Sequence, residues 1–152
     1  MSGTILYVID AMPNGGGPVV CYNLIKSLEA TEFSPCVVVL FYKGALGEKL
    51  ESEGIPLLCL NLRHPFRPGQ IMANCTRIIR FARANNVCLI HSHLTAAGLY
   101  GALTAIIMGL QSLATIHGSL PVRKGLKRGL LFLDVAVRNL FRTLVGVSRY
   151  GE

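Results

Sequence analysis

A run of three glycines is the first group of residues in this 152-residue chain whose type and spacing could do chemistry. Gly15, Gly16 and Gly17 follow a short apolar run and precede a segment of helical character. Because glycine has no Cβ, such a run can bring backbone N–H groups against a phosphate, and the N-terminus of a following helix favours negative charge. A flexible strand-to-helix turn is the alternative interpretation. The run is neither GxGxxG nor a Walker loop, since no Gly-Lys-Ser/Thr follows, which argues against a dinucleotide dehydrogenase or a P-loop enzyme.

Three histidines form the second group. His117 is followed by Gly118, and an imidazole there could hydrogen-bond a sugar hydroxyl or a phosphate, although a structural histidine is the alternative. His91 and His93 are two residues apart, so on a strand they face the same side. With His117 they could offer three nitrogens to a metal ion. No carboxylate lies close in sequence to complete or orient that site, so we expect no metal and no other cofactor.

Alternating strands and helices must position these residues. We expect strands over residues 5–9, 36–41, 57–60, 87–91, 113–116 and 144–147. We expect helices over residues 18–30, 46–53, 70–84, 95–108 and 124–142. The strands are too apolar to have a solvated face, which indicates a parallel sheet covered on both sides. The sequence therefore predicts one α/β domain over residues 1–152, a Rossmann-like doubly wound parallel sheet of about six strands with helices on both faces.

In such a sheet, of order 3-2-1-4-5-6, ligands bind beyond the carboxyl ends of the strands, where the order reverses between strands one and four. Strand one leads into the glycine run and strand four ends in His91 and His93. Strand five ends in His117 and Gly118, and strand six ends in Ser148. We expect all of these residues to line one edge.

The apolar composition has two possible explanations, a buried core or contact with a membrane. Half of the residues are hydrophobic and the mean hydropathy is +0.48, which fits either a sheet buried on both faces or a nearby membrane. No charged residue occurs between His93 and Arg123, a stretch long enough to span a bilayer. Gly109, Gln111 and Ser112 divide it into a helix-length and a strand-length piece, which favours a buried unit.

Charge is unevenly distributed. Residues 1–62 have a net charge of −3 and residues 63–152 a net charge of +10, which points to an anionic partner such as phosphate, acidic lipid or nucleic acid. Nucleic acid fits poorly, because no recognised binding motif or interleaved aromatic residue accompanies the charge. Arg123, Lys124, Lys127 and Arg128 begin the last predicted helix. They form either a solvated face or a surface for peripheral attachment to an anionic membrane, where each basic residue contributes roughly 1 kcal/mol.

The five cysteines are odd in number and show no CxxC spacing, and most lie in apolar runs. We therefore expect a reducing, cytoplasmic compartment. No secretory signal is visible, because the apolar run before Asp10 is too short.

Several short motifs follow one another along nearly the whole chain: the loop 15–18, the segments 43–46 and 54–57, residues 90–93 with Gly98 and Gly101 after them, and the runs 114–118 and 145–148. In order and spacing they resemble those of the family 4 retaining glycosyltransferases, enzymes of the GT-B fold with two facing Rossmann-like domains. The resemblance implies that the glycine loop approaches the donor diphosphate or the acceptor. It also implies that His117 is catalytic, in contact with the transferred sugar. Many members have Gly-Gly-x-Glu at the first loop, whereas Pro18 stands in the glutamate's place here.

The activity that this resemblance implies is transfer of a sugar from a nucleotide diphosphate sugar to a hydroxyl of a glycan or lipid-linked acceptor, in polysaccharide or glycolipid assembly. The chain would be the N-terminal, acceptor-side half, inactive without a C-terminal donor-binding domain or an equivalent subunit. It would work in the cytoplasm, on the inner face of the membrane if the basic helix attaches there. Two alternatives are a non-catalytic binding module that pairs with a separate donor-binding subunit, and a Rossmann-like nucleotide-binding protein unrelated to sugars.

Overall fold

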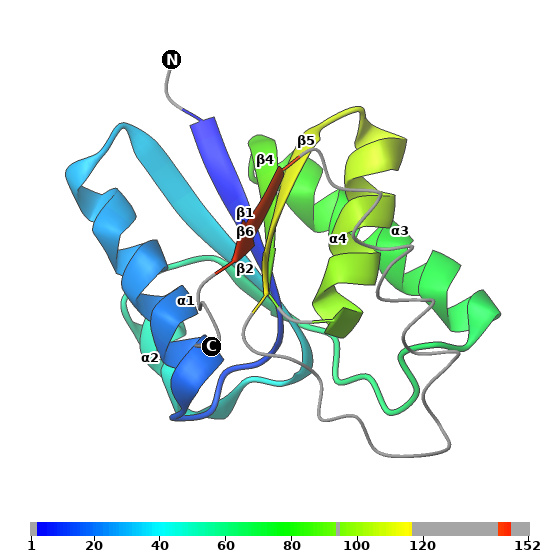
Figure 1. The fold of residues 1–152 in the computed structure, drawn as a ribbon, viewed down its shortest axis with the longest axis horizontal. Helices are drawn as coiled ribbons and strands as arrows, with labels where there is room; N and C mark the ends of the chain where they lie inside the picture. The colour runs from blue at the N-terminus through cyan, green and yellow to red at the C-terminus, as the bar shows by residue number, and fades with distance from the viewer. Residues whose placement is uncertain (1–2, 94, 117–142, 147–152) are drawn as a thin grey trace, which may run out of the picture.

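A computed structural model describes residues 3–93, 95–116 and 143–146 of the chain (Figure 1). The strands are β1 (Gly3–Ala11), β2 (Phe33–Tyr42), β3 (Leu57–Cys59), β4 (Val87–His93), β5 (Gln111–Ile116) and β6 (Thr143–Gly146). The helices are α1 (Gly16–Ser27), the 3₁₀ helix η1 (Leu28–Ala30), α2 (Gly44–Ser52), α3 (Pro68–Ala84) and α4 (Thr95–Met108). The helix expected over residues 124–142 lies outside the described residues.

The strands form one six-stranded sheet in the order β3-β2-β1-β4-β5-β6, and every pair of neighbours is parallel. The fold class and the strand order predicted from the sequence are therefore confirmed. β1 lies at the centre, with Leu6 opposite Cys36 of β2 and Tyr7 opposite His91 of β4. The order reverses between β1 and β4, so the ligand-binding edge expected of such a sheet lies where these two strands end.

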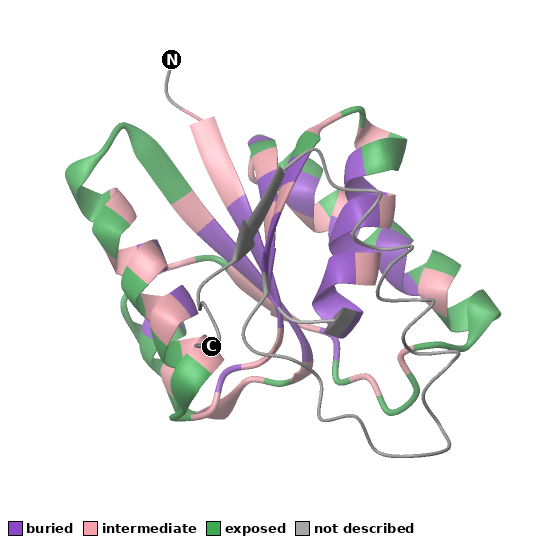
Figure 2. Cartoon of the chain, in the orientation of Figure 1, coloured by how far each residue is buried: buried purple, intermediate pink, exposed green. Residues whose placement is uncertain are grey.

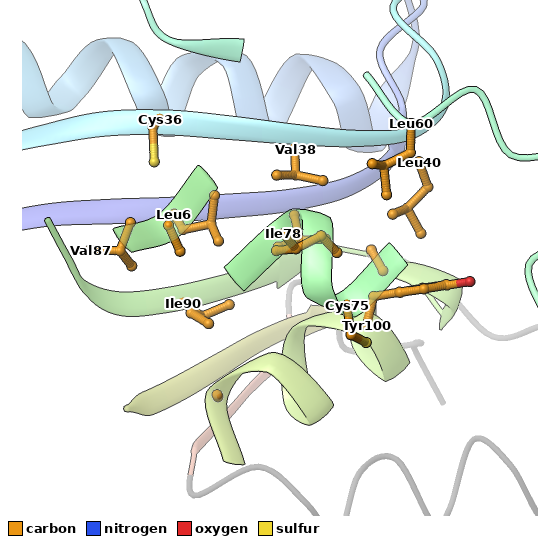
Figure 3. Packing of buried hydrophobic residues seen from close by; sticks show 14 of the residues in the cluster. Leu6, Cys36, Val38, Leu40, Leu60, Cys75, Ile78, Val87, Ile90 and Tyr100 are labelled. Carbon is orange, nitrogen blue, oxygen red and sulfur yellow. The ribbon is translucent and has the colours of Figure 1, made fainter. Parts of the chain in front are cut away.

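Helices cover both faces of the sheet: α3 and α4 lie on one side, and α1 and α2 on the other (Figure 1). Successive residues of a strand point to opposite faces, so each strand contributes to two cores. Leu6 and Val8 belong to the α3–α4 core with Ile78 and Tyr100, part of which Figure 3 shows. The core on the other face contains Tyr7, Ile9, Met12, Cys21, Ile25, Val37, Val39 and Leu50. Burial is concentrated in the middle of the sheet and on the inner sides of the helices, as Figure 2 shows.

Element boundaries differ from the predicted ones by a few residues. α1 begins at Gly16 instead of Pro18, so the proline lies within the first turn, where no intrahelical partner needs its missing N–H. The helix ends at Ser27, and a 3₁₀ turn covers the remaining predicted residues up to Ala30. β1 and β2 extend beyond their apolar runs, because backbone pairing between the two strands continues through Gly3 at one end and Tyr42 at the other.

The uncharged stretch before Arg123 divides as predicted into α4 and β5. Gly109 adopts a left-handed conformation at φ 68°, which glycine tolerates without strain. Hydrogen bonds from Gly109 N–H to the Ile106 carbonyl and from Leu110 N–H to the Ala105 carbonyl close the helix in a Schellman motif. Within the described part of the chain, no helix is long and apolar enough to cross a membrane.

Candidate functional site

The glycine-rich loop leaves the carboxyl end of β1 and opens α1. Gly15 and Gly16 are exposed, and a Cβ added at either position would meet no atom within 4 Å. Gly15 is the N-cap of α1, yet no side chain caps the helix and no acidic residue lies in its first turn. Room at the backbone and uncapped amides are the two conditions under which a helix N-terminus can accept an anion.

The other helix that begins at the reversal point, α4, has an acceptor for its amides. The Asp10 carboxylate at the end of β1 accepts a hydrogen bond of 2.7 Å from the backbone N–H of Ala97. Burial raises the pKa of Asp10 to about 6, and the hydrogen bonds from the Ala97 and Ala96 amides oppose that rise. A carboxylate at a helix N-terminus stabilises the positive end of the helix dipole. Of the two helices, α1 is therefore the one whose N-terminal amides have no side-chain cap. The sequence showed Asp10 only as the end of an apolar run, so this function of Asp10 was missed.

His91 and His93 lie on the same side of β4, as their spacing predicts. Their ring centroids are 4.4 Å apart, and that of Tyr7 on β1 lies 5.3 Å from His91 and 6.0 Å from His93. His91 Nε2 and Thr115 Oγ1 of β5 are joined by a hydrogen bond of 2.7 Å, whose donor depends on the histidine tautomer. Residues of three adjacent strands therefore form one group, named here the histidine cluster: Tyr7, His91, His93 and Thr115.

The histidine cluster is largely buried. Tyr7, His93 and Thr115 are each less than 5% exposed, and His91 is partly exposed. Burial, with a smaller contribution from the charge of Cys21, raises the pKa of Tyr7 to about 12, so its hydroxyl stays protonated at neutral pH. Tyr7 and Thr115 were not among the predicted site residues. Tyr7 alternates along β1 with Leu6 and Val8 of the α3–α4 core, and this alternation could have placed Tyr7 on the face of the histidines.

The packing of α4 on the opposite face of β4 explains why position 101, part of one of the short motifs along the chain, is glycine. A Cβ at Gly101 of α4 would lie 2.0 Å from the Ser92 Oγ, closer than any real contact. Gly101 therefore allows α4 to pack directly against β4, next to the point where β4 ends.

Several predicted site residues lie outside the described residues: His117, Gly118, Ser148, Arg123, Lys124, Lys127 and Arg128. β5 ends at Ile116, and β6 ends at Gly146. β5 is parallel to β4 and β6 is parallel to β5, so both strands end at this edge, one residue before His117 and two residues before Ser148. Within residues 3–93, 95–116 and 143–146, no three His, Cys, Asp or Glu side chains are placed to hold a metal ion.

Three of the five cysteines lie in the two cores of the domain. All five are free thiols, and Cys21 and Cys36 lie in the two cores, where burial raises the pKa of each thiol to about 12. They act as small apolar core residues, as the sequence suggests for most of the five.

Fold and edge together define a Rossmann-like domain with an uncapped helix N-terminus at its reversal point. The model of glycosyltransferase family 4 matches residues 14–150. The chain therefore belongs to glycosyltransferase family 4, as the short motifs along it suggested, and it has the fold of the N-terminal domain of GT-B enzymes. A search of curated proteins finds no match.

Solved structures similar to the chain share its fold at low sequence identity. MurG from Acinetobacter baumannii has a TM-score of 0.71 and 13% identity, with 97% of this chain aligned to 42% of MurG. HepE from Anabaena, solved in complex with UDP, has a TM-score of 0.71 and 20% identity over 91% of this chain and 35% of HepE. The UDP-GlcNAc 2-epimerase of Methanocaldococcus jannaschii has a TM-score of 0.66 and 13% identity over 95% of this chain and 39% of the epimerase. The chain thus spans about two fifths of the length of these proteins.

Proposed function

We propose that this chain is the acceptor-side half of a glycosyltransferase that moves a sugar from a nucleotide diphosphate sugar to a hydroxyl of a glycan or lipid-linked acceptor. Membership of family 4 supports sugar transfer, and the UDP held by the structurally similar HepE supports a nucleotide donor. The observation that carries the proposal is the open N-terminus of α1 at the reversal point, where Gly15 and Gly16 leave room and no side chain caps the amides.

The reaction is proposed to retain the anomeric configuration and to need no metal. As the bond from the sugar to the diphosphate breaks, negative charge grows on the leaving nucleotide diphosphate. Preorganised amides at a helix end stabilise such charge, and the N-terminal amides of α1 can do so. His117 follows β5 directly and is the proposed contact to the transferred sugar, while Gly17, His91, His93, Gly118 and Ser148 are the further proposed substrate-binding residues.

The proposed assignment divides the reaction between two domains. The chain is aligned to only 42% of the length of MurG, so a second domain, or an equivalent subunit, is proposed to hold most of the donor. The isolated chain is then inactive. Polysaccharide or glycolipid assembly is the proposed setting, in the cytoplasm, with the basic residues from Arg123 to Arg128 at an anionic membrane surface.

The experiment is a transfer assay with a panel of nucleotide diphosphate sugars. It compares the 152-residue chain alone, the same chain joined to the protein sequence encoded downstream of it, and the joined protein carrying His117→Ala. Transfer by the joined protein only, reduced at least tenfold by His117→Ala, is the expected result. Turnover and donor affinity that are unchanged in His117→Ala would remove His117 from the mechanism. A stop codon directly after Glu152, with activity only after addition of a separate subunit, would replace the enzyme half with a pairing module.

A further inference from the structure

A polar cavity lies at the start of α3. Its volume is about 350 Å³, and it lies between the segment that follows β3 and the first turns of α3. Three primary amides line it, from Asn61, Gln70 and Asn74, together with the side chains of Arg63 and His64. None of these residues was a candidate in the sequence, and none belongs to the edge between β1 and β4.

The walls of this cavity are fixed by the core. Leu62 N–H donates to the Leu40 carbonyl at 2.8 Å, which holds the segment against β2. The hydroxyl of the fully buried Tyr100 in α4 donates to the Pro65 carbonyl at 2.7 Å. Figure 3 shows that this hydroxyl extends out of the apolar cluster that surrounds the ring. Asn61 adopts φ 53°, a left-handed conformation that asparagine tolerates better than most residues. These contacts hold the loop between β3 and α3 in place.

The residues that line the cavity indicate which class of ligand it can bind. The amide oxygens of Asn61 and Asn74 accept hydrogen bonds from Cys59 Sγ at 3.3 Å and from Arg77 Nη1 at 3.4 Å. The N–H donors of the three primary amides suit the hydroxyl oxygens of a sugar, and the Arg63 guanidinium is a permanent cation with several donors. No Asp or Glu occurs between Glu53 and Asp134, so no acidic residue of this part of the sequence competes for the arginine. Asn74 is 7% exposed, whereas Arg63, His64 and Gln70 are exposed. A ligand with hydroxyls toward Asn74 and an anionic group toward Arg63 matches this arrangement.

The position of the cavity links it to the proposed acceptor. β3 is parallel to β2, and β2 to β1, so the segment that leads from β3 into α3 lies at the same edge of the sheet as the glycine-rich loop (Figure 1). We propose that the cavity binds an anionic sugar residue of the acceptor, one that carries a carboxylate or a phosphate beside its hydroxyls. The inference rests on the proposed function only in assigning the sugar to the acceptor. The binding site itself is defined by the lining residues.

The test is an NMR titration of the ¹⁵N-labelled 152-residue chain with four probes: glucuronic acid, glucose 6-phosphate, glucose and inorganic phosphate. We expect one or both charged sugars to shift the side-chain amide signals of Asn61, Gln70 and Asn74. Binding of the better charged sugar should be about tenfold tighter than binding of glucose or of phosphate alone, as the loss of a charge-assisted hydrogen bond implies. Which charged sugar binds tells whether the anionic group is a carboxylate or a phosphate.

Two variants and one control locate the site. Arg63→Gln removes the cation, and Gln70→Glu places a like charge in the cavity at an exposed position, so each should weaken binding of the charged sugar about tenfold or more. Arg83→Gln changes an exposed arginine in the last turn of α3, outside the cavity, and should leave binding unchanged. Glucose that binds as tightly as the charged sugars, shifts confined to other residues, or equal effects of all three variants would overturn the proposal.

This titration needs no donor and no transfer, so its outcome separates the two proposals. Binding at the cavity, together with no sugar transfer by the joined protein, would refute the proposed function and keep the site. Sugar transfer with no binding of either charged sugar would refute the site and keep the proposed function.

Discussion

The Asp10 carboxylate accepts a 2.7 Å hydrogen bond from the backbone N–H of Ala97, across the point where the strand order reverses. The bond joins the end of β1 to the N-terminus of α4, two segments 87 residues apart in sequence. α1 and α4 both begin at this point, and only the N-terminal amides of α1 have no side-chain cap. The position of a single carboxylate thus decides which helix end can accept an anion.

Asp10 should make stability depend on pH. Its pKa is raised from 3.8 to about 6 in the folded chain, so between these values the folded state binds more protons than the unfolded state. Stability therefore falls as the pH rises from about 4 to 7, by roughly 3 kcal/mol for this group. Asp10→Asn can still accept from Ala97 but does not titrate, so its stability relative to wild type should increase over this range. Urea unfolding at pH 4, 5, 6 and 7 measures the difference, and a difference that does not vary with pH would contradict the raised pKa.

Gly101 and Ser92 should be strongly coupled. A methyl group at position 101 would collide with the Ser92 Oγ, so Gly101→Ala should destabilise the chain by about 1–3 kcal/mol. The described residues give the Ser92 hydroxyl no hydrogen-bond partner, so Ser92→Ala alone should have a small effect. In the Ser92→Ala background, Gly101→Ala should be much less destabilising, because the Oγ is gone and alanine has a helix propensity about 1 kcal/mol better than glycine. A double-mutant cycle by urea unfolding checks the coupling, and additive effects would show that α4 does not lie so close to β4.

Thr115→Val tests the link between β4 and β5. Valine keeps the shape of threonine but removes the partner of His91 Nε2, so the chain should lose about 1–2 kcal/mol of stability. Thr115→Ser retains the hydroxyl and serves as the control for the hydrogen bond. Stability in Thr115→Val equal to that of wild type would mean that the bond contributes nothing.

Membrane attachment through Arg123, Lys124, Lys127 and Arg128 can be measured by vesicle flotation. Each basic residue near an anionic surface contributes roughly 1 kcal/mol, so replacing all four with glutamine should lower binding to anionic vesicles by about a hundredfold or more. Binding of the wild-type chain should weaken as salt is raised. Equal binding of the wild-type chain to anionic and neutral vesicles, or to neither, would remove the membrane from the proposed function.

The fold could be predicted because its signals are local and repeated. Runs such as 36–41 and helical segments such as 95–108 alternate along the chain, and parallel pairing with its crossover rule then leaves few topologies. The same topology predicts which strand ends share an edge, so Gly15 and His91 could be placed at that edge from sequence alone.

The remaining features depend on contacts that sequence periodicity does not contain. Asp10 caps a helix that begins more than eighty residues later, and nothing near position 10 indicates this partner. The cavity beside α3 depends on the left-handed Asn61 and on a hydroxyl from α4 that fixes the loop. Such loops follow no hydrophobic period, so their amides look like ordinary solvated residues until the chain is folded.

Gly15 offers the most direct test of sugar transfer at the carboxyl edge. Gly15→Asp in the joined protein puts a carboxylate at the N-cap of α1, in backbone that is extended and open, so it should stabilise the helix by a few tenths of a kcal/mol. The same carboxylate would occupy the amides proposed for the diphosphate, so the transfer rate should fall at least tenfold, while Gly15→Ala should transfer sugar at close to the wild-type rate. A Gly15→Asp protein that transfers sugar as fast as Gly15→Ala would contradict the placement of the reaction at this edge.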